Sequence, residues 1–360
     1  MIYNIFGKNI QINIKNSELK EILLKELEIY GKGDIEKLDY TINFIEKIEL
    51  SGIYSNTPSI HKTLNNGFFC DFGICKVLFT KVDNLKINVE YKASESYLSK
   101  FRSIMYRNSS ENIGQVLHEL IFIPLNFFDK ERTIIHSSSM KNLDTNRTLM
   151  IGGTGGVGKT SLELLLCREL NYSFISDDIA VVDNKGLLYP NLAFPKIYAY
   201  NVIDNKELKN VLFMNRTVID KMQWDIRKKL RGNSSVRRSI SPQDIFKSIE
   251  TSFNKIDDYY ILFKTNEANR IIVKDISSEM ASEMTLEILK NEYHSVFQHI
   301  TWHEYNCRLM GYEPVLRLED IFSNWKNLYN KIFTEINCKI VKIPLTIKHQ
   351  EFLKEMKSIF

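Results

Sequence analysis

The chain has 360 residues, 44% of them hydrophobic, which is enough to bury one large core or two ordinary ones and excludes a wholly disordered protein. Its 48 basic and 44 acidic residues are too evenly balanced to indicate a nucleic-acid partner by themselves. The N-terminal sequence lacks a basic region followed by an apolar one, and the longest apolar run, residues 120–128, is far shorter than the roughly 20 residues of a membrane helix. We therefore expect neither a signal peptide nor a membrane span. Five cysteines without a CxxC spacing predict reduced thiols in the cytoplasm.

Residues 1–129 are predicted to form a small α+β module, which would recognise substrate or pack a dimer. Alternating and helical apolar patterns predict a strand at 10–14, a helix at 17–30, and strands within 67–82 and 85–92. A helix at 112–130 is expected to break near Pro124, because proline cannot donate the helical hydrogen bond. This break is our preferred boundary before a second domain, residues 130–360.

The second domain shows the strand, loop and helix order of an α/β nucleotide-binding protein. Its first elements are expected at 133–138 (strand), 140–146 (turn), 148–153 (strand), 160–170 (helix), 172–176, 179–183 and 187–190 (strands). Residues 223–242 are basic and predicted to form a loop. The remaining elements are expected at 259–265 and 270–276 (strands), 278–306 (one long helix), 338–347 (strand) and 348–360 (helix). Histidines 294, 299 and 303 do not have the spacing of a zinc protease and are predicted to be structural.

A glycine-rich loop between the strand at 148–153 and the helix at 160–170 predicts a phosphate-binding site for ATP. Gly153, Gly158, Lys159 and Thr160 match the pattern G-x-x-x-x-G-K-[ST] in that context. Glycines let backbone N–H groups turn toward phosphate oxygens, the lysine supplies a full charge, and the threonine hydroxyl can bind Mg²⁺. The alternative is a glycine-rich turn without a ligand. The residues expected to bind the nucleotide are Gly153, Thr154, Gly155, Gly156, Val157, Gly158, Lys159, Thr160 and Ser161.

Asp177 and Asp178 follow the apolar strand at 172–176, where carboxylates can face a bound nucleotide. Adjacent residues of a strand point to opposite sides, so the two are expected to have different tasks. One could bind Mg²⁺ and the other could accept a proton from an attacking hydroxyl. The alternative is that one of them only opens the following hairpin.

Only residues 160–176 lie between Lys159 and Asp177, and His136 lies one strand before the loop. This compact arrangement resembles the HPr kinase family, whose fold is related to phosphoenolpyruvate carboxykinase. The resemblance implies transfer of the γ-phosphate of ATP to a serine hydroxyl. It also implies that Lys159 and Thr160 hold the phosphates and Mg²⁺, that Asp177 is the general base with His136 beside it, and that Asp178 helps to hold the metal.

The basic segment contains Arg237 and Arg238, one of which could contact the transferred phosphate or an acidic substrate, because phosphoryl transfer spreads charge over the equatorial oxygens. A solvated loop is the alternative for this segment, and a structural residue is the alternative for His136.

The sequence thus predicts an α/β, HPr kinase-like enzyme that uses ATP and Mg²⁺. Its acceptor would be a serine or threonine hydroxyl of a small protein, a peptide or a free amino acid, with no nucleic-acid or membrane partner, and a homo-oligomer is left open. The alternative is a regulatory or assembly ATPase; no guanine-reading NKxD sequence occurs. A third interpretation is a protein that binds nucleotide without catalysing a reaction.

Overall fold

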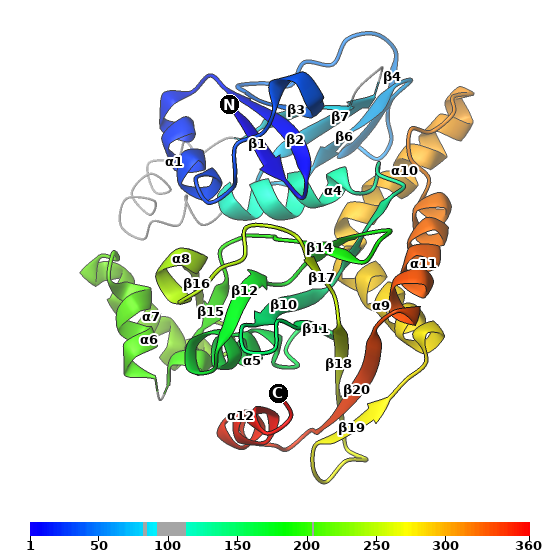
Figure 1. The fold of residues 1–360 in the computed structure, drawn as a ribbon. Coiled ribbons are helices and arrows are strands. Elements are labelled where there is room, and N and C mark those ends of the chain that lie inside the picture. The colour runs from blue at the N-terminus through cyan, green and yellow to red at the C-terminus, as the bar shows by residue number, and fades with distance from the viewer. Residues whose placement is uncertain (82–84, 92–112, 204) are drawn as a thin grey trace. The chain divides into compact units, whose positions relative to one another are not determined.

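The computed structural model describes residues 1–81, 85–91, 113–203 and 205–360, which form a mixed α/β protein (Figure 1). The chain divides into two units, each built from separate segments. Of the described residues, the first unit comprises 1–81, 85–91, 113–130 and 290–325, and the second comprises 131–203, 205–289 and 326–360. The expected boundary near residue 130 coincides with a boundary between units, and residues 290–325 return to the first unit.

The first unit contains, within its described residues, an eight-stranded sheet in the order β1-β2-β3-β8-β7-β6-β5-β4. The β1–β2 hairpin turns at Phe6 and Gly7, which both have positive φ, as a two-residue turn between twisted strands requires. Strand β3 pairs in parallel with β2 and β8, and the other pairs are antiparallel. The strands are β1 (Ile2–Ile5), β2 (Lys8–Ile14), β3 (Leu38–Ile45), β4 (Tyr54–Asn56), β5 (His61–Leu64), β6 (Gly67–Asp71), β7 (Lys76–Lys81) and β8 (Leu85–Glu90).

The helices of the first unit come from both ends of the chain. Helix α1 (Ser17–Leu27) begins after Asn16, whose side chain accepts a hydrogen bond from the Leu19 N–H, and the 3₁₀ turn η1 (Ile35–Lys37) follows. The π-helical segment η2 (Val116–Phe122) continues into α4 (Ile123–Leu125), so the helix runs through Pro124 and ends one residue after it, near the expected break. Helix α10 (His294–Met310) packs on β5 and β6. Helix α11 (Leu318–Thr334) contributes residues to both units.

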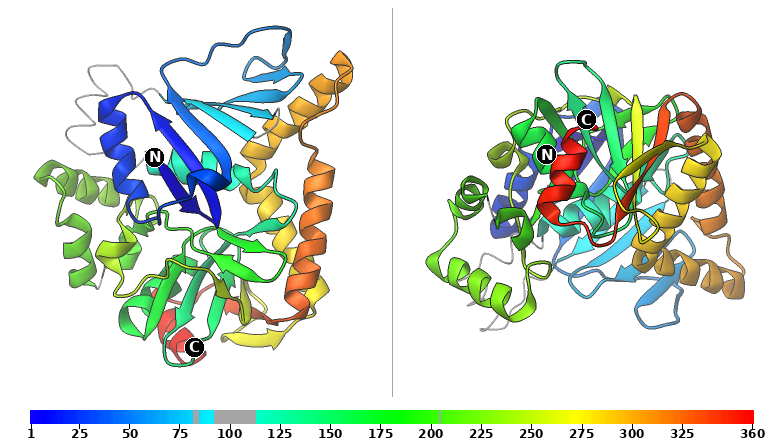
Figure 2. Two further views of the ribbon diagram at one scale, coloured as in Figure 1. Left: turned by 45° about the horizontal axis from the view of Figure 1, so that its top comes forward. Right: turned by 90° about the horizontal axis from the view of Figure 1, so that it is seen from below.

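The second unit contains a six-stranded sheet in the order β12-β10-β11-β18-β20-β19. Strand β18 is parallel to β11 and β20, and Figure 2 shows β18 and β20 side by side. The helical segment after β11 consists of α5 (Lys159–Leu164) and η3 (Leu165–Glu169), and α12 (His349–Lys357) packs against it. The strands are β10 (Ser137–Asn142), β11 (Thr148–Gly152), β12 (Tyr172–Ser176), β18 (Asp258–Thr265), β19 (Ile272–Asp275) and β20 (Asn337–Pro344).

Two smaller sheets and further helices complete the second unit. One sheet has the order β17-β14-β13-β9, and the other is the ribbon of β15 and β16. Their strands are β9 (Arg132–Ile135), β13 (Ala180–Asp183), β14 (Leu187–Tyr189), β15 (Lys196–Tyr198), β16 (Arg237–Ser239) and β17 (Asn254–Lys255). The helices are η4 (Ala199–Val202), α6 (Lys206–Phe213), α7 (Val218–Arg231), α8 (Pro242–Ile245) and α9 (Ser278–Glu292).

Strand directions bring three chain segments to one edge of the six-stranded sheet. Strand β10 is antiparallel to both β11 and β12, with Ser137 opposite Gly152 and Ser139 opposite Ser176. Strands β11 and β12 therefore point the same way. The loop after β11, the residues after β12 and the residues before β10 consequently meet at this edge.

Four expectations about secondary structure are wrong. The strand expected at 133–138 is divided at His136 into β9 and β10, which belong to different sheets. The first half of the basic segment is helical, because α7 begins after Thr217, whose side chain accepts a hydrogen bond from the Asp220 N–H, and continues through good helix formers to Arg231. The expected helix over 278–306 is divided into α9 and α10 at Tyr293, which is not helical. The turn expected at 140–146 starts later, since β10 continues to Asn142. No helix of the described residues is both long and apolar enough to cross a bilayer.

Candidate functional site

The glycine-rich loop leaves β11 at Gly152 and enters α5 at Lys159. Three glycines of the loop have backbone conformations that residues with a side chain rarely adopt: Gly153 (φ +135°), Gly156 (φ +77°) and Gly158 (φ +112°). At Gly158 a Cβ atom would also lie 2.8 Å from the ring of Phe352 on α12. The loop path therefore requires glycine at the position directly before Lys159.

Lys159 is 6% exposed, and its ammonium group is held inside the loop. Its Nζ donates to the carbonyl oxygens of Gly153 (2.8 Å) and Thr154 (3.1 Å). Nε2 of His136, the residue between β9 and β10, lies 2.9 Å from the same Nζ and accepts from it as a neutral imidazole. The sequence analysis placed His136 beside the general base, and the contact that the structure shows for it is with Lys159.

Asp177 lies under the loop, 4% exposed, directly after β12. Its Oδ1 accepts hydrogen bonds from the hydroxyls of Ser138 (3.1 Å) and Thr160 (3.3 Å). Burial, followed by the neighbouring charge of Asp178, raises the pKa of Asp177 to about 6. Of the two aspartates, Asp177 is therefore the one in contact with the threonine of the glycine-rich loop.

Asp178 differs from Asp177 in conformation, exposure and charge partner. Its φ is +61°, its side chain is 41% exposed, and its Oδ2 lies 3.4 Å from Nζ of Lys196 on β15. Burial opposes ionisation, but the charge of Lys196 and, to a smaller extent, that of Lys159 lower the pKa of Asp178. Neither aspartate lies in a strand, so the alternation along a strand expected from the sequence does not apply to them. They differ instead in their partners, Ser138 and Thr160 for Asp177 and Lys196 for Asp178.

Glu163 is a residue of this site that the sequence analysis missed. It lies on α5, is fully buried, and has no hydrogen bond of ordinary geometry to a described residue. Burial, followed by the nearby charge of Asp177, raises its pKa well above the ordinary value and so favours the neutral carboxyl.

The β15–β16 ribbon extends the site beyond Lys196. Lys196 and Tyr198 are two residues apart and so share one face of β15, and Arg237 lies opposite Tyr198 on β16. The guanidinium of Arg237 donates to the Tyr198 hydroxyl (3.0 Å) and lies over its ring. The face of the ribbon that reaches Asp178 therefore also presents Arg237, about 7 Å further along the strand.

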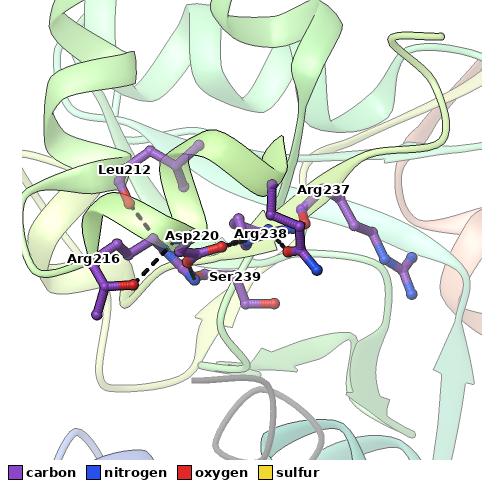
Figure 3. Close-up of polar contacts among 8 residues, drawn as sticks. Leu212, Arg216, Asp220, Arg237, Arg238 and Ser239 are labelled. Carbon is purple, nitrogen blue, oxygen red and sulfur yellow. Dashed lines mark hydrogen bonds and ion pairs between the residues drawn. The ribbon is translucent and has the colours of Figure 1, made fainter. Parts of the chain in front are cut away.

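Arg238 has a different environment from Arg237. It is 4% exposed, and its guanidinium donates to Oδ1 of Asp220 through Nε (2.9 Å) and Nη2 (2.6 Å) (Figure 3). A further hydrogen bond joins it to Gln223 on α7 (2.8 Å). Arg238 thus attaches α7 to the β15–β16 ribbon. Of the two expected arginines, only Arg237 is exposed.

The site contains oxygen donors that suit Mg²⁺, a hard cation. Thr160 Oγ1 and Asp177 Oδ1 are adjacent, and Asp178 is the next residue. No group of three or more His, Cys, Asp or Glu side chains with metal-binding geometry occurs in the part of the chain that the structure describes. The donors fit a cation that keeps several waters and binds phosphate oxygens, as Mg²⁺ does, better than a cation enclosed by protein ligands alone.

No model of a known protein family matches the chain, and no curated protein matches it.

Proposed function

We propose that the protein is an ATP-dependent kinase of the HPr kinase-like type, which transfers the γ-phosphate to a serine or threonine hydroxyl of a peptide, small protein or free amino acid. This proposal rests on one observation: a glycine-rich loop with its lysine, and two aspartates with different partners, lie together where β11 and β12 end. A phosphate cradle needs the first two features, and transfer to a hydroxyl needs carboxylates with different tasks.

The nucleotide would bind in the glycine-rich loop. Backbone N–H groups of residues 153–161 would contact the phosphates, and Lys159 would exchange its bonds to Gly153 and Thr154 for bonds to phosphate oxygens. Its contact with His136 keeps the ammonium group directed to this end of the site. Thr160 and Asp177 would hold Mg²⁺, which when bound neutralises charge on the phosphates.

The acceptor hydroxyl would lie against Asp178. Its greater exposure and its position beside Lys196 support this role, because the acceptor must enter from solvent and the transferred phosphate needs a cation. Arg237, on the same face of the ribbon, would contact the phosphate or the acceptor. The resemblance to HPr kinases implies the opposite roles for the two aspartates. The contact of Asp177 with Thr160 supports the order proposed here.

Incubation with γ-labelled ATP, Mg²⁺ and serine-containing peptides or free serine tests this function. Wild-type protein should label the acceptor, and Lys159→Ala should lose about two orders of magnitude or more of activity while staying folded. Asp178→Asn should reduce transfer at saturating Mg²⁺, whereas Asp177→Asn should raise the Mg²⁺ concentration needed. Asp244→Asn, an exposed aspartate of α8, is the matched control.

The same assay distinguishes a kinase from the alternative, a regulatory ATPase. A kinase should release little inorganic phosphate without an acceptor, and labelled acceptor should account for the ATP consumed. Rapid hydrolysis in water with no acceptor labelled would instead support a regulatory ATPase. Wild-type turnover in a folded Lys159→Ala protein would refute both.

A further inference from the structure

Helix α7 turns an apolar face toward solvent. Its residues Val218, Ile219, Met222, Ile226 and Leu230 are all exposed, with fractions of 58% for Met222 and 78% for Leu230. At 100° per residue they cover one continuous arc of about 120°. Met214, just before the helix, is also exposed. An apolar stripe along a helix normally packs against the protein's own hydrophobic core. When such a stripe is exposed to solvent instead, it marks an interaction surface.

The opposite face of α7 is firmly attached to the second unit. Asp220 and Trp224 are each 1% exposed. Asp220 accepts hydrogen bonds from Arg216 and from Arg238, as Figure 3 shows, and Arg238 also lies over the Trp224 ring. Because these contacts fix the rotation of the helix, turning to bury the apolar stripe would expose both the buried ion pair and the tryptophan.

The apolar stripe is bordered by positive charge. At 100° per residue, Lys221 and Arg227 lie about 60° beyond the two sides of the stripe, and Lys229 lies within it. All three are exposed and have no ion pair within the described part of the chain. Of the two acidic residues of the helix, Asp220 is buried with its arginines and Asp225 lies 3.7 Å from Lys209. The solvent side of α7 therefore carries its apolar stripe between two basic residues, Lys221 and Arg227.

We propose that this face of α7 docks an acidic amphipathic helix of a polypeptide partner, and, on the basis of the proposed function, that this partner is the phosphate acceptor. Apolar side chains of such a helix would cover the stripe, and its acidic flanks would meet Lys221 and Arg227. Methionine at 214 and 222 suits this role, because its flexible thioether adapts to different apolar partners.

Two other occupants fit less well. A second copy of the chain would place one basic border against another, since a two-fold interface pairs a surface with itself. A membrane surface is usually met by exposed tryptophan or phenylalanine, and the aromatic residue of this helix, Trp224, is buried on the other side.

The attachment of α7 also connects the docking face to the candidate site. Arg238, bonded to Asp220 of α7, lies on β16, which pairs with β15. Strand β15 carries Lys196 at Asp178. A partner held on α7 is thus anchored to the same ribbon that borders the acceptor side of the site.

Binding of a designed probe tests the docking surface in the full chain. The probe is a fluorescein-labelled peptide of Leu, Glu and Ala about five helical turns long, with Leu on one face. Its control is a peptide of the same composition in scrambled order. Fluorescence anisotropy should give at least about tenfold tighter binding of the amphipathic peptide than of the scrambled one. Met222→Asp should weaken that binding about tenfold or more, whereas Ile53→Asp, at an even more exposed apolar residue of the first unit, should not.

A second arm links docking to phosphate transfer. The probe is extended with a serine-containing tail, and labelling is compared with that of the tail alone. The helix should lower KM for the tail about tenfold, and Met222→Asp should remove this gain without changing labelling of the tail alone. If no tail is labelled at all, the proposed function fails. If the tail is labelled equally well with and without the helix, the docking inference fails.

Other outcomes would also overturn the inference. Equal affinity for the scrambled peptide would show that charge alone binds the probe. Binding to phosphatidylglycerol vesicles that is lost in Met222→Asp would assign the face to a membrane. Sedimentation of a wild-type dimer that becomes a monomer in Met222→Asp would assign it to a second copy of the chain.

Discussion

Acidification should destabilise the first unit through buried histidines of α10. His299 is 5% exposed and has its Nδ1 2.5 Å from Nδ1 of His61 on β5, and His303 is 1% exposed beside Phe68. Burial, followed by the charge of His61, lowers the pKa of His299 to about 3. Burial lowers the pKa of His303 to about 4.

The direction of this pH dependence of stability follows from the number of protons that each state binds. An unfolded histidine has a pKa of about 6.5, so between that value and the folded pKa the unfolded state binds more protons than the folded state. Stability is therefore fully present above about pH 6.5 and falls as the pH drops toward the folded pKa values. At pH 5 each of these histidines should cost about 2 kcal/mol relative to neutral pH, or about 4 kcal/mol together.

Urea unfolding at pH 7.5 and pH 5, followed by tryptophan fluorescence, measures this effect, because Trp302 and Trp325 belong to the first unit. His299→Gln, which removes the titration but keeps a polar partner for His61, should lose about half of the pH dependence. His294→Gln, at the exposed start of the same helix, should retain all of it. Equal unfolding free energies at the two pH values in the wild type would refute the reasoning.

Four further substitutions test the site. Arg237→Ala should lower phosphate transfer and change the unfolding free energy by less than about 0.5 kcal/mol. Arg238→Ala should lower the unfolding free energy by about 3 kcal/mol, because the loss of Arg238 leaves the buried carboxylate of Asp220 with Arg216 alone. Both are measured by acceptor labelling and urea unfolding, and similar stabilities would contradict the contrast. Glu163→Gln should change stability by less than about 1 kcal/mol, because burial raises the pKa of Glu163 and so favours the neutral carboxyl that the amide resembles, and a large loss in thermal unfolding would contradict this reasoning. Gly158→Ala should lower the unfolding free energy by about 1–2 kcal/mol and abolish nucleotide binding, measured by calorimetry, since its φ is +112° and Phe352 occupies the space of a Cβ; unchanged binding would contradict the loop geometry.

The glycine-rich loop and the aspartate pair could be found from sequence because their signals are local. A glycine spacing before a helix and two carboxylates after an apolar strand can be recognised without knowing what packs against them. Their partners could not be found that way. The contact of Asp177 with Ser138 depends on β10 lying between β11 and β12, and this strand order is set by pairing across the sheet.

Glu163 and Lys196 illustrate the same limit. In sequence Glu163 is an ordinary helical glutamate, and only the packing of α5 on β10 shows that its carboxyl is buried near Asp177. Lys196 is a lone lysine far from any motif until β15 brings it to Asp178. Neither residue belongs to a recognisable spacing, so tertiary structure was needed to find them.

The basic segment was misjudged for a different reason. Its composition suggested a solvated loop, although two local signals for a helix were present. Thr217 followed by Asp220 is a helix start, and Gly232 is a helix end. Recognition of β16 would also have separated Arg237 from Arg238, because neighbouring residues of a strand face opposite ways.

The discontinuous make-up of the first unit has a consequence during synthesis. Strands β5 and β6 are complete once residue 71 is made, but the helix that covers them, α10, ends at residue 310. At about 5–20 residues per second, the ribosome needs on the order of 10–50 s to make the intervening chain. Meanwhile Phe68 and His61 lack their native neighbours from α10. Newly made chains therefore depend on protection from aggregation during this interval, and strand pairing alone cannot complete the first unit.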